Sequence, residues 1–178
     1  ATYEEKARDY YGEVIAHARK LTDLPITIVE STKASETNYC AELVDIMCLN
    51  RYYGWYDELA NLNAVELLYK DEFKKYHDKY GKPILLTEFG AEALSGFHSL
   101  SAEAFSEEYQ KTIIEKTCGV IDEIPYVIGE HVWSFADFKT REGILRPGGN
   151  RKGVFTKDRQ PKLSAYYLCE RWKHKKEK

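Results

Sequence analysis

Short apolar runs of strand length alternate with amphipathic helix patterns along most of this chain. The runs typical of strands are residues 26–30, 44–50, 84–88 and 126–135. The segments typical of helices are residues 3–24, 62–80, 106–121 and one that begins at Pro161. Residues 31–43 read as a loop with a single helical turn. Alternation of this kind predicts parallel strands joined by right-handed crossovers, so we expect an α/β fold of about four parallel strands with flanking helices.

The third strand-like run, within Lys82–Gly90, ends abruptly in a glutamate, an aromatic residue and a glycine. We therefore expect Glu88 at the carboxyl end of a buried parallel strand, where α/β folds place their chemistry. From this stretch alone, an acid that merely caps the following helix is an equal alternative.

Aromatic and polar residues also follow the other strand-like runs. Residues 51–56 hold four aromatic residues around a glycine, and Trp133 and Phe135 end the fourth run beside Asp137. Aromatic residues fill cores more often than they line binding sites, so packing is the first interpretation of residues 51–56. Aromatic and polar residues at the end of one strand after another are typical of a (β/α) barrel. The chain has neither GxGxxG nor GxxxxGK[ST], which counts against nucleotide binding.

Charge and cysteine usage narrow the class of partner. The net charge is −3, and the one basic cluster is the terminal segment 173–178, so we expect no nucleic-acid partner. No run is long enough to span a membrane. The four cysteines lack metal-ligand spacing and are expected to be reduced. The cysteine spacing therefore predicts no bound metal. Reduced cysteines and the lack of an Asn-x-Ser/Thr acceptor favour a cytoplasmic location.

Four motifs, in this order, carry a family resemblance. They are Asn50–Tyr56, Thr87–Gly90 with Gly96–His98, Trp133–Phe138 and Gly148–Gly153. With them the chain resembles the C-terminal half of the catalytic (β/α)₈ barrel of β-glucuronidases in glycoside hydrolase family 2. The resemblance covers residues 1–178, and four strands are half of such a barrel.

The resemblance implies that Glu88 is the catalytic nucleophile of a retaining glycosidase, forming a covalent glycosyl-enzyme intermediate. Tyr52 matches a tyrosine close to that nucleophile, and Tyr56 matches one that reaches the sugar.

The resemblance also implies a pocket for a glucuronide. Asn150 and Lys152 match an Asn-x-Lys motif that binds the glucuronate carboxylate, an arrangement of amide donor and point charge that suits an anion. Trp133 matches a tryptophan under the sugar ring, and Arg146 matches an arginine at the carboxylate end of the pocket. The resemblance implies no cofactor.

One departure from the family pattern matters for activity. The family's general acid/base glutamate lies in an Asn-Glu-Pro motif, and residues 1–3 align just after it. Because a retaining hydrolase needs two carboxyl groups, we expect this chain alone to be inactive. Glu30 and Asp137 do not match the missing acid/base. A half-barrel exposes two strand edges, so we expect the N-terminal half of the same enzyme, or a second copy, as a partner.

Two other interpretations stay open. The chain could be a non-catalytic half-barrel scaffold, natural or engineered, that dimerises. It could also belong to a family-2 glycosidase for a neutral sugar, although a neutral sugar gives Lys152 no charge to meet.

Overall fold

A computed structural model describes residues 2–30 and 38–176, and part of the predicted loop 31–43 therefore lies outside the described residues. Its strands are β1 (Val29–Glu30), β2 (Met47–Asn50), β3 (Ile84–Phe89) and β4 (Val127–Val132). Its helices are α1 (Glu5–Ala18), the 3₁₀ turn η1 (Ala41–Leu43), α2 (Ala64–Tyr80), α3 (Glu107–Asp122) and α4 (Leu163–Lys176). The strands form one sheet in the order β1-β2-β3-β4, with every pair parallel. The predicted α/β fold of four parallel strands is confirmed, and it corresponds to part of a TIM barrel.

The first strand is shorter than the sequence predicts. Residues 26–28 run beside the start of β2, where the backbone N–H of Asp45 donates to the carbonyl of Ile26 at 2.8 Å and side chains make the other contacts. Asp45 Oδ2 accepts from the backbone N–H of Ile26 at 2.7 Å, and the hydroxyl of Thr27 donates to the carbonyl of Ile46 at 2.7 Å. A regular backbone ladder therefore begins only at Val29, opposite Cys48.

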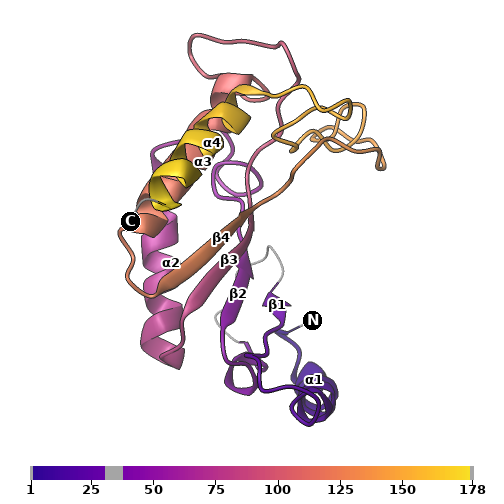
Figure 1. Cartoon of the computed structure of the whole chain (residues 1–178), viewed down its shortest axis with the longest axis vertical. Coiled ribbons are helices and arrows are strands. Elements are labelled where there is room, and N and C mark those ends of the chain that lie inside the picture. The colour runs from indigo at the N-terminus through magenta and orange to yellow at the C-terminus, as the bar shows by residue number, and fades with distance from the viewer. Residues whose placement is uncertain (1, 31–37, 177–178) are drawn as a thin grey trace.

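Three helices cover one face of the sheet. α2, α3 and α4 lie side by side there, whereas α1 lies beside the β1 edge (Figure 1). Local signals set their ends: the hydroxyl of Ser106 accepts from the backbone N–H of Tyr109 at the start of α3, and Gly81 ends α2 in the left-handed conformation. The core between the sheet and these helices includes Ile84, Leu86 and Phe73, all fully buried.

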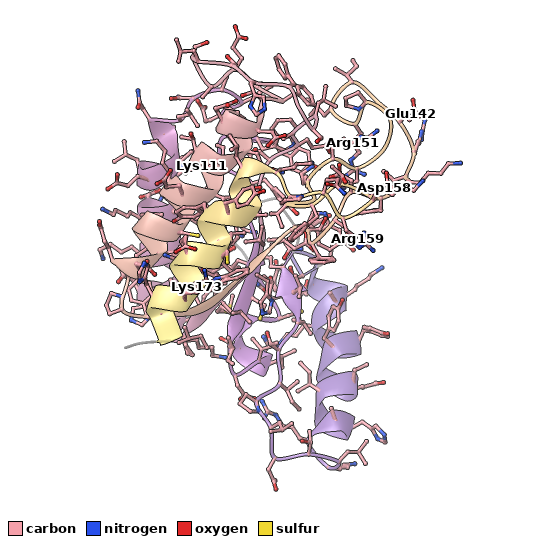
Figure 2. All side chains as sticks on the ribbon, turned by 45° about the horizontal axis from the view of Figure 1, so that its top comes forward. Lys111, Glu142, Arg151, Asp158, Arg159 and Lys173 are labelled. Carbon is pink, nitrogen blue, oxygen red and sulfur yellow. The ribbon has the colours of Figure 1, made fainter. Side chains whose placement is uncertain are left out.

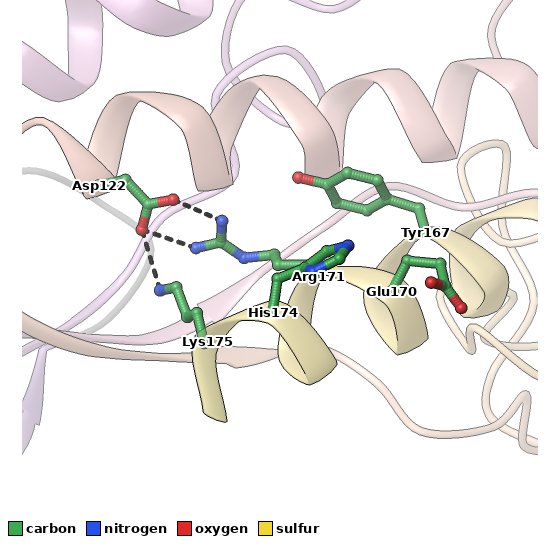
Figure 3. Close-up of a pocket in the computed structure, with 6 residues that line it drawn as sticks. All are labelled: Asp122, Tyr167, Glu170, Arg171, His174 and Lys175. Carbon is green, nitrogen blue, oxygen red and sulfur yellow. Dashed lines mark hydrogen bonds and ion pairs between the residues drawn. The ribbon is translucent and has the colours of Figure 1, made fainter. Parts of the chain in front are cut away.

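A cluster of charged residues fixes α4 against α3 and β4. Arg171 of α4 donates to both carboxylate oxygens of Glu130 in β4, at 2.9 and 2.7 Å, and to both of Asp122 at the end of α3, at 2.5 and 2.9 Å. Lys175 adds a second contact to Asp122 at 2.9 Å (Figure 3). The last helix is thus held by ion pairs as well as by its apolar side, which includes the buried Leu168.

The two edges of the sheet are less well covered. Among the described residues β1 pairs only with β2, and β4 only with β3. Only Ile15 of α1 is buried, while Tyr10 and Val14 stay exposed, so this helix packs only a small part of its apolar face. At the other edge, an apolar groove is lined by Phe135, Val154 and Trp172, among others. Within the described part of the chain, no helix combines the length and apolarity needed to cross a membrane.

Candidate active site

Because all four strands are parallel, the segments that follow β2, β3 and β4 gather at one end of the sheet (Figure 1). The segment after β4 forms an extended group of loops there. In Figure 2, Arg151 lies close to the body of the molecule and Glu142 lies at the outer tip of these loops. Every residue that the sequence singles out for the site lies on β3 or in the segments that follow β2 and β4.

Glu88 lies near the carboxyl end of β3 and is half-buried. The hydroxyl of Tyr52, just after β2, donates to Glu88 Oε2 at 2.7 Å. The backbone N–H of Arg51 donates to the carbonyl of Glu88 at 2.9 Å, so the nucleophile candidate is held at both its backbone and its side chain. Burial, and then the hydrogen bond to Glu88, raise the pKa of Tyr52, which keeps its phenol protonated as a donor.

Trp133 follows β4 and lies beside the end of β3. Its backbone N–H donates to the carbonyl of Phe89 at 2.9 Å, and its peptide bond to Ser134 is cis. Gly90 makes this approach possible: it has a φ of +141°, and a Cβ there would lie 2.8 Å from the carbonyl oxygen of Trp133. Gly90 is therefore needed for the close contact between the ends of β3 and β4.

Lys152 has a side chain that is only 1% exposed. Its ammonium donates to the hydroxyl of Tyr56 at 2.8 Å and to Glu92 Oε1 at 3.0 Å. The same ammonium lies 4.6 Å from the ring centroid of Tyr56 and 5.5 Å from that of Tyr52. Tyr52 thus donates to Glu88 while its ring lies near the Lys152 ammonium, and this places Glu88 and Lys152 in one site.

Asn150 and Arg146 complete the set predicted from the sequence. Asn150 is buried, and its Oδ1 accepts from the backbone N–H of Lys152 at 3.0 Å. Arg146, whose side chain is 41% exposed, donates to the hydroxyl of Tyr56 at 3.1 Å. All seven predicted residues therefore belong to one strand-end cluster, joined through Tyr52 and Tyr56 or, for Trp133, through the end of β3.

The aromatic segment 51–56 divides between the two roles that the sequence left open. Tyr53 and Trp55 are buried in the core, and the phenol of Tyr53 donates to Glu72 of α2 at 2.8 Å. Tyr52 is also buried in the core, but its hydroxyl and that of Tyr56 meet charged residues of the candidate site. Residues 51–56 therefore contribute both to the core and to the candidate site.

A buried ion network lies directly behind this segment. The guanidinium of Arg51 is fully buried and pairs with Glu72 at 2.8 Å and with Glu30 at 3.6 Å. Burial raises the pKa of Glu30, in spite of hydrogen bonds from Tyr76 and Asn38. Glu30 is thus part of the packing that fixes Arg51, and with it the backbone contact to Glu88.

Sequence reasoning missed the buried residues that hold the Asn150–Lys152 motif. Lys162 donates to the carbonyl of Arg151 at 2.9 Å, and Gln110 of α3 donates to the carbonyl of Lys152 at 3.3 Å. Glu92 accepts from the backbone N–H of Arg151 at 3.2 Å. For Glu92 the sequence offers one signal, because it is a second acid shortly after Glu88. For Lys162 and Gln110 it offers none, because their contacts depend on long-range packing.

The site offers one candidate nucleophile, a cluster of phenols and a cation site suited to an anionic group. No group of His, Cys, Asp and Glu within the described ranges has the arrangement of a metal site. The four cysteines are free; Cys169 is exposed and the other three are buried.

The parallel sheet and its strand-end cluster define a partial TIM-barrel domain with a candidate active site at the usual end. A family model described as "Glycosyl hydrolases family 2, TIM barrel domain" matches residues 2–176. The chain belongs to glycosyl hydrolase family 2.

Curated relatives and solved structures agree with this assignment. The chain is 42% identical over 173 residues to a β-glucuronidase of Paenibacillus borealis, covering 97% of this chain and 29% of the relative. It is 41% identical to human β-glucuronidase, covering 27% of that protein. The structure of a Dictyoglomus thermophilum β-D-glucuronidase superposes with a TM-score of 0.92 at 48% identity, covering 97% of this chain and 30% of the other. This chain thus spans less than a third of the length of these relatives.

Proposed function

We propose that residues 1–178 form the C-terminal half of the catalytic barrel of a retaining β-glucuronidase, which hydrolyses β-D-glucuronides. In this proposal Glu88 is the nucleophile and Tyr52 holds its carboxylate. Tyr56, Trp133 and Arg146 contact the sugar, and the carboxylate of the sugar meets Asn150 and Lys152. The similarity to β-glucuronidases over 97% of this chain supports this substrate class.

One observation carries the proposal: a buried lysine lies in the same site as the candidate nucleophile. Tyr52 donates to Glu88, and its ring centroid lies 5.5 Å from the Lys152 ammonium. A sugar with its anomeric carbon at Glu88 would extend toward Lys152, and a uronic acid carries its carboxylate on C5, which the ring oxygen separates from the anomeric carbon. The charge of Lys152 favours such an anion over a neutral sugar.

A second part of the proposal concerns a partner. A retaining glycosidase needs an acid/base carboxyl group about 5–5.5 Å from its nucleophile. We propose that the N-terminal half of the same barrel supplies that group and covers the edges at β1 and β4. A second copy of this chain could cover the same edges, but it would bring a second nucleophile and no matched acid/base. The scaffold interpretation therefore predicts a dimer without activity.

A chimeric enzyme tests the substrate class. The 173 matching residues of the P. borealis β-glucuronidase would be replaced by this chain, and hydrolysis of an aryl β-glucuronide and an aryl β-glucoside would be compared. In Lys152→Ala the glucuronide kcat/KM should fall by about ten- to a hundredfold, because a charge-assisted contact is lost. The glucoside kcat/KM should fall far less.

Lys157→Ala is the matched control, since it removes an exposed lysine five residues further on. Its ratio of glucuronide to glucoside hydrolysis should equal that of the unchanged chimera. If Lys152→Ala also leaves the ratio unchanged, the lysine does not read the carboxylate, and a family-2 glycosidase for a neutral sugar becomes the better proposal.

The cellular location is a separate proposal. We propose a cytoplasmic protein, because all four cysteines are free and Cys40, Cys48 and Cys118 are buried as thiols. Detection of the native protein in the soluble fraction of broken cells, with four titratable thiols after denaturation, tests it. Disulfide-linked cysteines in the native protein would contradict it.

A further inference from the structure

Glu92 is a fully buried carboxylate to which neither the motif resemblance nor the proposed function gives a role. It lies four residues after Glu88, in the segment that follows β3. Its Oε1 lies 3.0 Å from the Lys152 ammonium, and its Oε2 accepts from the backbone N–H of Arg151 at 3.2 Å. One side chain thus contacts both the charge and the backbone of the Asn150–Lys152 motif.

Lys152 needs an anionic partner because its ammonium is removed from water. Its other contacts are the Tyr56 hydroxyl at 2.8 Å and nearby aromatic rings, which offer only partial negative charge. Across the part of the chain that the structure describes, Glu92 is the one carboxylate paired with Lys152. A buried ammonium without such a partner would reorient toward water or toward other acceptors.

The local charges also fit one additional carboxylate. Arg146 Nε lies 4.0 Å from Glu92 Oε1, so Lys152 and Arg146 share this one acid. Two positive groups and one negative group leave a net charge of +1 at this end of the site. A single carboxylate from a uronic acid would balance that charge, whereas a neutral sugar would not.

We propose that Glu92 is the positioning residue of Lys152 and thereby sets the preference for a uronic acid over a neutral sugar. This inference rests on the proposed function. Because Glu88 lies at the carboxyl end of β3 and Glu92 lies in the segment that directly follows this strand, Glu92 also fixes where the carboxylate-binding lysine lies relative to the nucleophile. The sugar is then held at its anomeric carbon and at its carboxylate by the same segment, once directly and once through Lys152.

The test uses the chimeric enzyme with the Glu92→Gln variant, which keeps the size of the side chain and removes its charge. The KM for the aryl glucuronide should rise about tenfold or more, since the lysine loses the contact that positions it. The kcat for the glucuronide should change less than its KM. For the aryl glucoside, kcat/KM should change by less than about threefold, because no sugar carboxylate meets Lys152 in that complex.

Glu107→Gln is the matched control. Glu107 is also buried and also holds backbone N–H groups, those of Gly96 and Leu163, each at 2.8 Å. A purely structural role for Glu92 predicts that Glu92→Gln and Glu107→Gln lower both hydrolyses together. The proposal predicts a fall in the ratio of glucuronide to glucoside hydrolysis in Glu92→Gln alone.

A double-mutant cycle separates positioning from direct substrate contact. In a Lys152→Ala background, Glu92→Gln should cause no additional fall in the ratio, since its effect acts through the lysine. An unchanged ratio in Glu92→Gln itself, or an equal further fall in the Lys152→Ala background, would overturn the inference. If Glu92→Gln does not fold, Glu92→Asp keeps the charge on a shorter arm, and its ratio should lie below that of the unchanged chimera; an equal ratio would again overturn the inference.

Failure of the proposed function would be recognised separately. It would appear in the unchanged chimera as no preference for the glucuronide. If that chimera binds but does not hydrolyse the sugars, calorimetric binding of D-glucuronate against D-glucose gives the same comparison of variants without turnover. A glucuronate preference that persists in Glu92→Gln would contradict the role of Glu92 while leaving the substrate class intact.

Discussion

The phenol of Tyr52 donates a 2.7 Å hydrogen bond to Glu88 Oε2, across 36 residues of sequence and between two adjacent strands. Parallel pairing makes this contact possible: Asn50 is the register partner of Glu88, so the residue two places beyond β2 reaches the end of β3. The contact orients one carboxylate oxygen of Glu88, the proposed nucleophile.

Replacing Tyr52 by phenylalanine should lower kcat of the chimeric enzyme by about ten- to a hundredfold, with a smaller change in KM. The reason is that a hydrogen bond to a charged group, which orients the nucleophile, is worth about 1.5–3 kcal/mol. Steady-state kinetics on the aryl glucuronide measures it. Tyr53→Phe is the control, because that hydroxyl also meets a carboxylate, Glu72 at 2.8 Å, but does not touch Glu88. Equal losses in the two variants would mean that Tyr52 acts through stability alone.

This chain expressed alone should not behave as a stable monomer. Two sheet edges lack a strand partner among the described residues, and Ile128 in β4 and Phe135 beyond it are 57% and 63% exposed. Analytical ultracentrifugation should find dimers or larger species, with binding of a dye that reports apolar surface. A monodisperse particle of 20.7 kDa that melts cooperatively and binds no dye would contradict this expectation.

Acid should weaken the attachment of α4. The hydrogen bond from Arg171 lowers the pKa of Asp122. Burial opposes ionisation of Glu130, yet its contacts with Arg171 still lower its pKa. Both folded pKa values lie below the unfolded ones, so this stabilisation is complete above about pH 5 and is lost as the pH falls through the folded values. The melting temperature of the chimeric enzyme should therefore drop as the pH falls below about 5.

The variant Arg171→Gln should be less stable at neutral pH, by about 3 kcal/mol, because the buried Glu130 would lose its two guanidinium hydrogen bonds and keep only longer contacts, such as those with Trp172 at 3.3 Å and Lys175 at 3.6 Å. Its melting temperature should also depend less on pH in the acid range. Lys173→Gln provides the comparison: it removes another cation of α4 whose pair with Glu170 is exposed and should contribute little. Parallel pH curves for Arg171→Gln and the unchanged enzyme would show that the cluster does not carry the acid sensitivity.

The elements that the sequence predicts well are those with a local cause. The run that ends in Glu88 is apolar, follows the helix stop at Gly81 and becomes β3 almost residue for residue. Residues 26–28 also have strand-like composition, but only one backbone hydrogen bond, from Asp45 to Ile26, joins them to the start of β2. The side chains of Asp45 and Thr27 make the other contacts there, and composition does not report which side chain takes that role.

The candidate site shows the same limit. Motifs place Asn150 and Lys152 in one loop, and parallel topology brings that loop to Glu88. The partner of Lys152, however, is Glu92, 60 residues earlier in the chain. Such a pair depends on how a loop folds over a neighbouring strand end, and neither periodicity nor charge count contains that information.

Covalent trapping determines whether Glu88 is the nucleophile. The chimeric enzyme would be incubated with an activated 2-deoxy-2-fluoroglucuronide, which slows hydrolysis of a glycosyl-enzyme intermediate more than its formation, and then digested for peptide mass spectrometry. We expect one added fluoroglucuronosyl group, located on Glu88 and absent in Glu88→Gln. Attachment to another residue in an enzyme that is active on glucuronides, or hydrolysis with inversion at the anomeric carbon, would contradict this role of Glu88.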